Sequence, residues 1–109
     1  MLQVKNELEQ LITAIRNSDI ALRYEEIRKK VEQDAELARQ INEFRKRNFE
    51  MQTQTYPDHL MEKSDSFTQE YACFRENPMV REFLEAELAY CRMLQEVTTE
   101  IVGVVSLDV

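Results

Sequence analysis

Apolar side chains recur along most of this chain at steps of three and four residues, which is the period of one face of an α-helix. The first stripe consists of Val4, Leu8, Leu11, Ile12 and Ile15. The second stripe consists of Ile20, Tyr24, Ile27 and Val31. The pattern predicts a helix ending near Asn17 and a second one running to about Glu32, with Asn17 or Ser18 as the cap between them.

A third helix is predicted from Asp34 to about Gln54. Asp34 is a favourable cap, and Glu36 places a negative charge in the first turn, where the helix dipole favours it. The buried stripe of this helix is expected to contain Leu37, Ile41, Phe44 and Met51. Asn48 falls where the same period would place another apolar side chain, and a polar residue at such a position can fix the register of packing.

Two prolines divide the second half of the chain. Residues 55–58 are expected to form a loop, because Pro57 sets its own backbone angle and disfavours helix at Tyr56. A fourth helix is expected up to Asn77, and Leu60, Phe67, Tyr71 and Phe74 share its apolar face. Asn77 followed by Pro78 is the strongest helix start in the chain, since asparagine caps and proline suits the first helical position.

The fifth helix is the longest, and its apolar positions extend beyond what the earlier helices match in length. They are Val80, Phe83, Leu84, Leu88, Cys91, Leu94, Ile101 and Val105. An uncovered stripe of this kind would be an exposed apolar patch that favours association, so we expect a second subunit to cover it. The expected subunit interface consists of Leu88, Cys91, Leu94, Ile101 and Val105. The alternatives are that Gly103 ends the helix and the tail folds back or frays, or that the tail adds a strand to a partner.

Composition agrees with a helical fold. The 109 residues include one glycine and two prolines, with 43% hydrophobic and 32% charged residues, which is too apolar for a disordered chain. The sequence therefore predicts a single all-α domain over residues 1–109. Its expected architecture is an antiparallel helical bundle of about five helices with a long C-terminal helix, dimerising through that helix.

The expected location is the cytoplasm. Residues 1–10 carry Lys5, Glu7 and Glu9 and no apolar run, so we expect neither a signal peptide nor a membrane span to begin there. Without an export signal, Cys73 and Cys91 are expected to stay reduced. Both lie within helical patterns, and we expect them to be small core residues.

The net charge of −7 opposes general affinity for nucleic acid, but the charge is uneven. Residues 23–50 hold eight basic and seven acidic side chains, whereas the rest of the chain holds six and fourteen. Arg45, Lys46 and Arg47 are therefore a candidate contact for an acidic partner. An RNA-contacting accessory factor in messenger RNA processing is the alternative function that follows from them, and a solvated helix face is the simpler interpretation.

The sequence offers little catalytic chemistry. With Gly103 as its one glycine, it contains no phosphate-binding loop, dinucleotide fingerprint or nucleophile elbow. His59 lies beside Asp58 and three residues before Glu62, so a metal-binding helical protein is a remote alternative. A dimetal bundle would need a second histidine from a symmetric partner. We expect an exposed loop-edge histidine, no catalytic residues, no metal and no cofactor.

The stretch from Asn77 to Glu87, with its Pro-x-Val-x-x-Phe-Leu-x-Ala-Glu pattern, is followed by Leu94, Val97 and Ile101. This stretch, together with the order of the preceding helices, resembles the YlbF/YmcA family of bacterial proteins over nearly the whole chain. The resemblance implies a small, self-associating helical bundle. It also implies a non-enzymatic regulator of competence, sporulation and biofilm formation that acts as a partner of other proteins.

Better-known members of that family form a complex linked to ribonuclease-dependent messenger processing, and they carry iron–sulfur clusters on cysteines in extended C-terminal tails. Cys73 and Cys91 do not match that cysteine-rich pattern, so the resemblance implies no cluster here. The expected function is that of a regulatory adaptor whose mechanism is surface burial. Its expected partners are a second copy and other regulatory proteins, with no membrane and no direct nucleic-acid contact.

Overall fold

Polar caps set where the first helices begin. The computed structural model describes residues 1–105, and helices α1 (Leu2–Arg16), α2 (Asp19–Glu32) and α3 (Ala35–Gln54) fill its first half. The Ser18 hydroxyl accepts a hydrogen bond from the backbone N–H of Ala21 at 3.2 Å, and the Asp34 carboxylate accepts one from the N–H of Leu37 at 3.1 Å. These bonds satisfy donors that a helix start leaves unpaired, so the predicted boundaries are confirmed.

The second half contains a short 3-10 turn, η1 (Pro57–His59), and helices α4 (Leu60–Glu70), α5 (Ala72–Glu76) and α6 (Pro78–Val104). The Asn77 side chain accepts a hydrogen bond from the N–H of Met79 at 2.9 Å and caps α6 as expected. The described residues contain no strand, and the predicted all-α fold with a long C-terminal helix is confirmed.

One expected helix is two helices in the structure. Tyr71 has φ −100° and ψ 12°, outside the helical region, and it separates α4 from α5. Phe67, Tyr71 and Phe74 surround the ring of Phe44, with ring centroids at 5.2, 5.0 and 5.5 Å from it. These contacts hold α4 and α5 against α3, and the spacing of the three rings, which suits a continuous helix, did not indicate the break.

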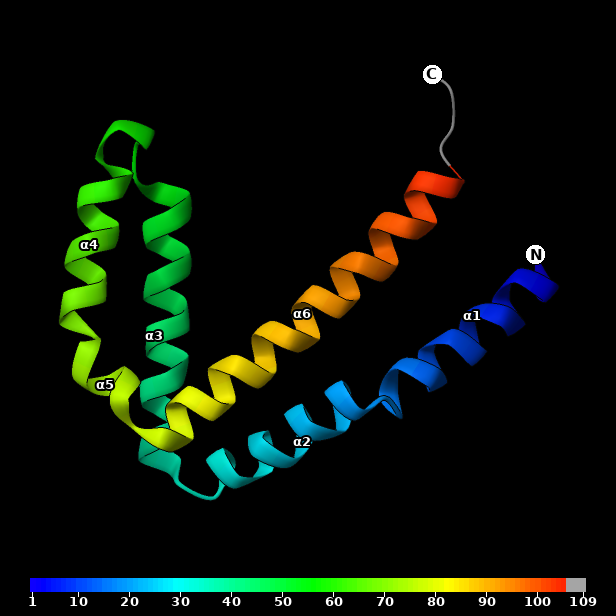
Figure 1. Cartoon of the computed structure of the whole chain (residues 1–109), viewed down its shortest axis with the longest axis horizontal. Helices are drawn as coiled ribbons and strands as arrows, with labels where there is room; N and C mark the ends of the chain where they lie inside the picture. The colour runs from blue at the N-terminus through cyan, green and yellow to red at the C-terminus, as the bar shows by residue number, and fades with distance from the viewer. Residues whose placement is uncertain (106–109) are drawn as a thin grey trace.

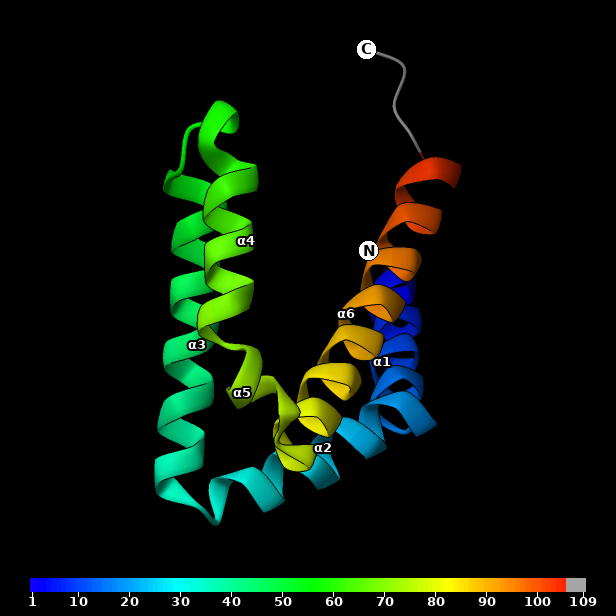
Figure 2. The same ribbon diagram turned by 60° about the vertical axis from the view of Figure 1, so that its left-hand side comes forward.

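The helices form two arms that meet in a V (Figure 1). One arm contains α3, with α4 running back alongside it and α5 at its base. In the other arm α2 packs along the first part of α6, and α1 and the distal part of α6 then diverge (Figure 1 and Figure 2). The molecule measures 49 × 39 × 17 Å, so it is flat as well as open.

The main core lies where the two arms meet. It is a cluster from α2, α3 and α6 that consists of Ile27, Val31, Ile41, Val80, Phe83 and Ala86. The aromatic cluster around Phe44 extends this core into the α3–α4 arm. The outer parts of α1 and α6 contribute no fully buried side chain among the described residues.

The open shape leaves an unusually large surface. The accessible surface is 8910 Å², whereas a compact monomer of 13.0 kDa exposes about 6,300 Å². The radius of gyration is 17.9 Å, compared with about 13 Å for a compact domain of this length. This chain exposes far more surface than a compact single domain of its size.

Candidate protein-interaction surfaces

The distal part of α6 presents an apolar face that the chain does not cover. Leu94, Ile101 and Val105 are 38%, 48% and 71% exposed. At 3.6 residues per turn, Leu94 and Ile101 continue the same face of the helix as Phe83, which is buried where α2 packs against α6. The stripe is therefore one continuous face, covered in its first half and open in its second. We call its open half the distal stripe, Leu94, Ile101 and Val105.

Helix α1 presents a second apolar stripe. Its exposed members are Val4, Leu8 and Ile12, and Leu11 and Ile15 on the same face are half-buried. The junction of α1 with α2 reaches α6 where the Ser18 hydroxyl lies 3.8 Å from the sulfur of Met93. From there the two helices diverge (Figure 1). Sequence reasoning identified this stripe but did not identify it as an interface.

The predicted subunit interface divides into two faces of α6. Leu88 and Leu94 are six residues apart, which places them about 120° apart around the helix axis. Leu88 and Cys91 are both exposed and line a hollow that faces α3; Leu88 lies apart from the distal stripe, and Cys91, about 60° from Leu94, lies between the two faces. Steps of three and four residues placed Leu88 and Leu94 in one stripe, because a series of such steps can drift around the helix.

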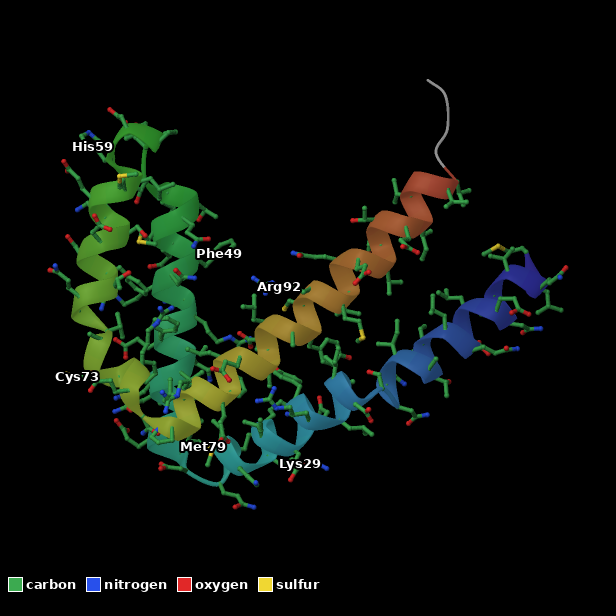
Figure 3. All side chains as sticks on the ribbon, viewed as in Figure 1. Lys29, Phe49, His59, Cys73, Met79 and Arg92 are labelled. Carbon is green, nitrogen blue, oxygen red and sulfur yellow. The ribbon has the colours of Figure 1, made fainter. Side chains whose placement is uncertain are left out.

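Leu88 and Cys91 line a groove at the base of the V. Two adjoining hollows of about 310 and 380 Å³ form this groove, and both are lined by Arg75, Leu84 and Leu88. Helix α3 forms the opposite wall of the larger hollow with Phe44, Arg45 and Asn48. Asn48, expected at a position that fixes register, therefore faces this groove. Figure 3 shows Phe49, the next residue, pointing from α3 into the angle between the arms.

The basic triplet on α3 is largely engaged within the chain. The Arg45 guanidinium lies 2.9 Å from the Glu87 carboxylate of α6 and 5.9 Å from the centre of the Phe83 ring. Arg47 binds both oxygens of Glu70 on α4, at 2.6 and 2.9 Å, and donates to the Tyr71 hydroxyl at 2.7 Å. Lys46 is exposed and makes no ion pair among the described residues. Arg45 and Arg47 thus join α3 to other helices, and Lys46 has no carboxylate partner among the described residues.

The Arg47–Glu70 pair makes a small contribution to stability that depends on pH. Hydrogen bonding to Arg47 lowers the pKa of Glu70 below its ordinary value of 4.5. Because the folded-state pKa is the lower one, the stabilisation is present above pH 4.5 and is lost as the pH falls through the folded-state pKa. We expect Glu70→Gln to lower the urea midpoint slightly at neutral pH and to leave it unchanged in acid. Glu62→Gln, on the same helix, is the control. If Glu70→Gln lowered the urea midpoint in acid as much as at neutral pH, the assignment would be wrong.

The chemistry-bearing side chains do not converge. His59 Nε2 lies 3.6 Å from the Asp58 carboxylate, and both side chains are mostly exposed. Within residues 1–105 no three His, Cys, Asp or Glu side chains are grouped as metal ligands. Cys73 and Cys91 are both free and exposed, so their expected place in the core is wrong. Cys73 lies on a helix of little more than one turn, and Cys91 lies on the groove side of α6.

None of the described helices is both long enough and apolar enough to cross a bilayer.

Comparison with known proteins gives one family and two relatives. A family model described as control of competence regulator ComK, YlbF/YmcA, matches residues 4–106. A UPF0342 protein of Caldicellulosiruptor bescii is 28% identical over 91 residues, covering 82% of this chain and 76% of the relative. A UPF0342 protein of Caldicellulosiruptor saccharolyticus is 25% identical over 100 residues, covering 90% and 83%. No solved structure matches.

Proposed function

The chain belongs to the YlbF/YmcA family, described by control of the competence regulator ComK, and on that premise we propose that it is a non-enzymatic regulatory adaptor. It acts through protein–protein contacts, in the cytoplasm, as a homodimer. The family description concerns control of another protein, which supports a role that depends on partners. The scattered positions of His59 and the two cysteines give no support to catalysis.

One observation carries this proposal: the chain has two apolar helix faces that it does not cover itself. The distal stripe and the α1 stripe contain half of the exposed Leu, Ile and Val side chains of the described residues. Contiguous apolar surface of this kind marks interaction sites on monomers. It is also what a second copy with the same two faces would bury in a symmetric contact.

The surface area is sufficient for such a contact. The chain exposes roughly 2,600 Å² more than a compact monomer of its mass. Each partner in a standard protein interface buries about 800 Å². A dimer that covered only part of the excess would therefore reach the size of a stable interface. Folding and association would then be linked, and the melting temperature would rise with protein concentration.

Light scattering across a dilution series tests this proposal. We expect twice 13.0 kDa for the wild-type chain. Ile101→Glu and Leu94→Glu are expected to give monomers at concentrations where the wild type is dimeric, because a buried unpaired carboxylate costs several kcal/mol. Leu22→Glu is the matched control. Leu22 is 52% exposed on α2, outside both stripes, so its variant should remain a dimer.

A wild-type monomer at every concentration would overturn the homodimer. A dimer that persists in both α6 variants would place the subunit contact elsewhere. In that case Leu8→Glu distinguishes the α1 stripe from any other surface, because Leu8 is half-exposed at the middle of that stripe.

A further inference from the structure

We propose that the groove between α3 and α6, at the base of the V, binds an acidic amphipathic helix of another protein. This inference deepens the proposed adaptor function and rests on it, since it names the chemistry of one partner. Leu88, at the centre of the groove, lies about 120° around α6 from Leu94, so a dimer that buries the distal stripe does not have to cover Leu88.

The floor of the groove has the shape that an apolar helix face requires. Arg81, Leu84, Leu88 and Cys91 follow one another along α6 at steps of three and four residues. Their span of ten residues is about 15 Å at 1.5 Å per residue, or roughly three turns. Leu88 is 49% exposed although it lies at the centre of this floor. A helix of another protein laid between α3 and α6 would cover Leu88 with its apolar face, as amphipathic helices do in apolar grooves of other proteins.

The groove carries positive charge that this chain does not neutralise. Its two carboxylates each have a cation nearby: Glu87 has Arg45 at 2.9 Å, and Glu85 has Arg23 at 3.9 Å. Arg75 and Arg81 make no ion pair with any carboxylate of the described residues. Two guanidinium groups therefore lie beside one apolar floor without a carboxylate partner among the described residues.

Arg75 is also held in position. Its guanidinium carbon lies 5.2 Å from the centre of the Phe44 ring, so the aromatic cluster orients it at the edge of the groove. Guanidinium groups bind carboxylates through two parallel hydrogen bonds, and a held guanidinium loses less freedom on binding. The occupant that fits is therefore a helix with leucine-like side chains on one face and glutamate or aspartate on its flanks.

Synthetic peptides test this assignment directly against the full-length protein. The probe is a helix of about 14 residues, or nearly four turns, with leucines at i, i+3 and i+7 and glutamates on both flanks. The comparison peptide has lysine in place of each glutamate. We expect fluorescence anisotropy at low salt to show at least tenfold tighter binding of the acidic peptide, weakening as salt is added. Equal affinity for the two peptides, or no binding of either, would overturn the proposal.

Two variants assign the binding to the groove. Arg75→Glu with Arg81→Glu should lose at least tenfold in affinity for the acidic peptide and gain affinity for the lysine peptide. Leu88→Gln should weaken the binding of both peptides, because it removes the apolar side chain at the centre of the floor. The control carries Arg16→Glu and Lys29→Glu, the same change of charge on α1 and α2. A loss of affinity in this control equal to that in the groove variant would show that net charge alone attracts the peptide.

The mass of each variant separates this inference from the dimer. The groove variants are expected to keep the wild-type mass, and Ile101→Glu is expected to keep peptide affinity while losing the dimer. If a groove variant becomes monomeric, the occupant of the groove is a second copy and the inference is wrong. If peptide binding fails while the dimer persists, the inference fails and the proposed homodimer stands.

Discussion

Replacing Phe44 with alanine is expected to destabilise the protein by about 3–5 kcal/mol, which is the usual cost of removing a buried phenylalanine ring. Phe44 is 4% exposed and lies within aromatic contact of Phe67, Tyr71 and Phe74. These contacts join α3 to α4 and α5, so the loss would loosen the whole arm. Urea unfolding followed by circular dichroism measures it, against a total stability of about 5–15 kcal/mol for domains of this kind.

Phe49→Ala is the matched control for this experiment. Phe49 lies on the same helix five residues further on, but it is 66% exposed. Its variant should change stability by no more than about 0.5 kcal/mol, as for surface sites in general. Equal effects of the two substitutions would mean that the aromatic cluster does not hold the arm together.

Replacing Ala86 with aspartate is expected to prevent folding. Ala86 has no exposed surface and lies in the core cluster where α6 meets α2 and α3. A carboxylate at that position would be desolvated without a cation built to receive it, at a cost of more than about 3 kcal/mol. The added volume would also force α2 away from α6. We expect the variant to lack the cooperative thermal transition of the wild type in circular dichroism.

Ala14→Asp supplies the comparison. Ala14 is exposed on α1, so the same substitution there should cost less than about 1 kcal/mol, mainly through helix propensity. A folded Ala86→Asp protein with wild-type stability would show that α2 and α6 do not pack closely at this point.

Both substitutions act on the base of the V, which also positions the candidate surfaces. The core sets the direction in which the distal half of α6 leaves α2, and it holds Phe44 beneath Arg75. Because the groove adjoins this core, the melting temperature of each groove variant must be measured to separate a loss of binding from a loss of folding.

Helix limits were readable from the residues because capping is local. Ser18, Asp34 and Asn77 each bind an N–H two or three residues ahead, and that requirement is visible in the sequence without knowledge of the fold. The resemblance carried by residues 77–87 was confirmed by the family match for the same reason: it consists of neighbouring residues.

Coverage of each apolar stripe was decided by the tertiary structure. Periodicity shows that Val4 and Phe83 each lie on an apolar face, but one is exposed and the other buried. Helical spacing likewise indicated neither the break at Tyr71 nor the exposure of Cys91. Spacing describes one helix at a time, and burial depends on which other helix lies across from it.

The sequence by itself therefore determined that the chain is helical, where most helices begin and end, and which side chains share a face. The tertiary structure decided that the stripe of α6 is open beyond Leu94, that Leu88 belongs to a separate groove, and that Arg45 and Arg47 bind carboxylates of other helices. The physical reason is range. Capping and periodicity act within a few residues, whereas burial and charge pairing depend on segments that meet only when the chain has folded.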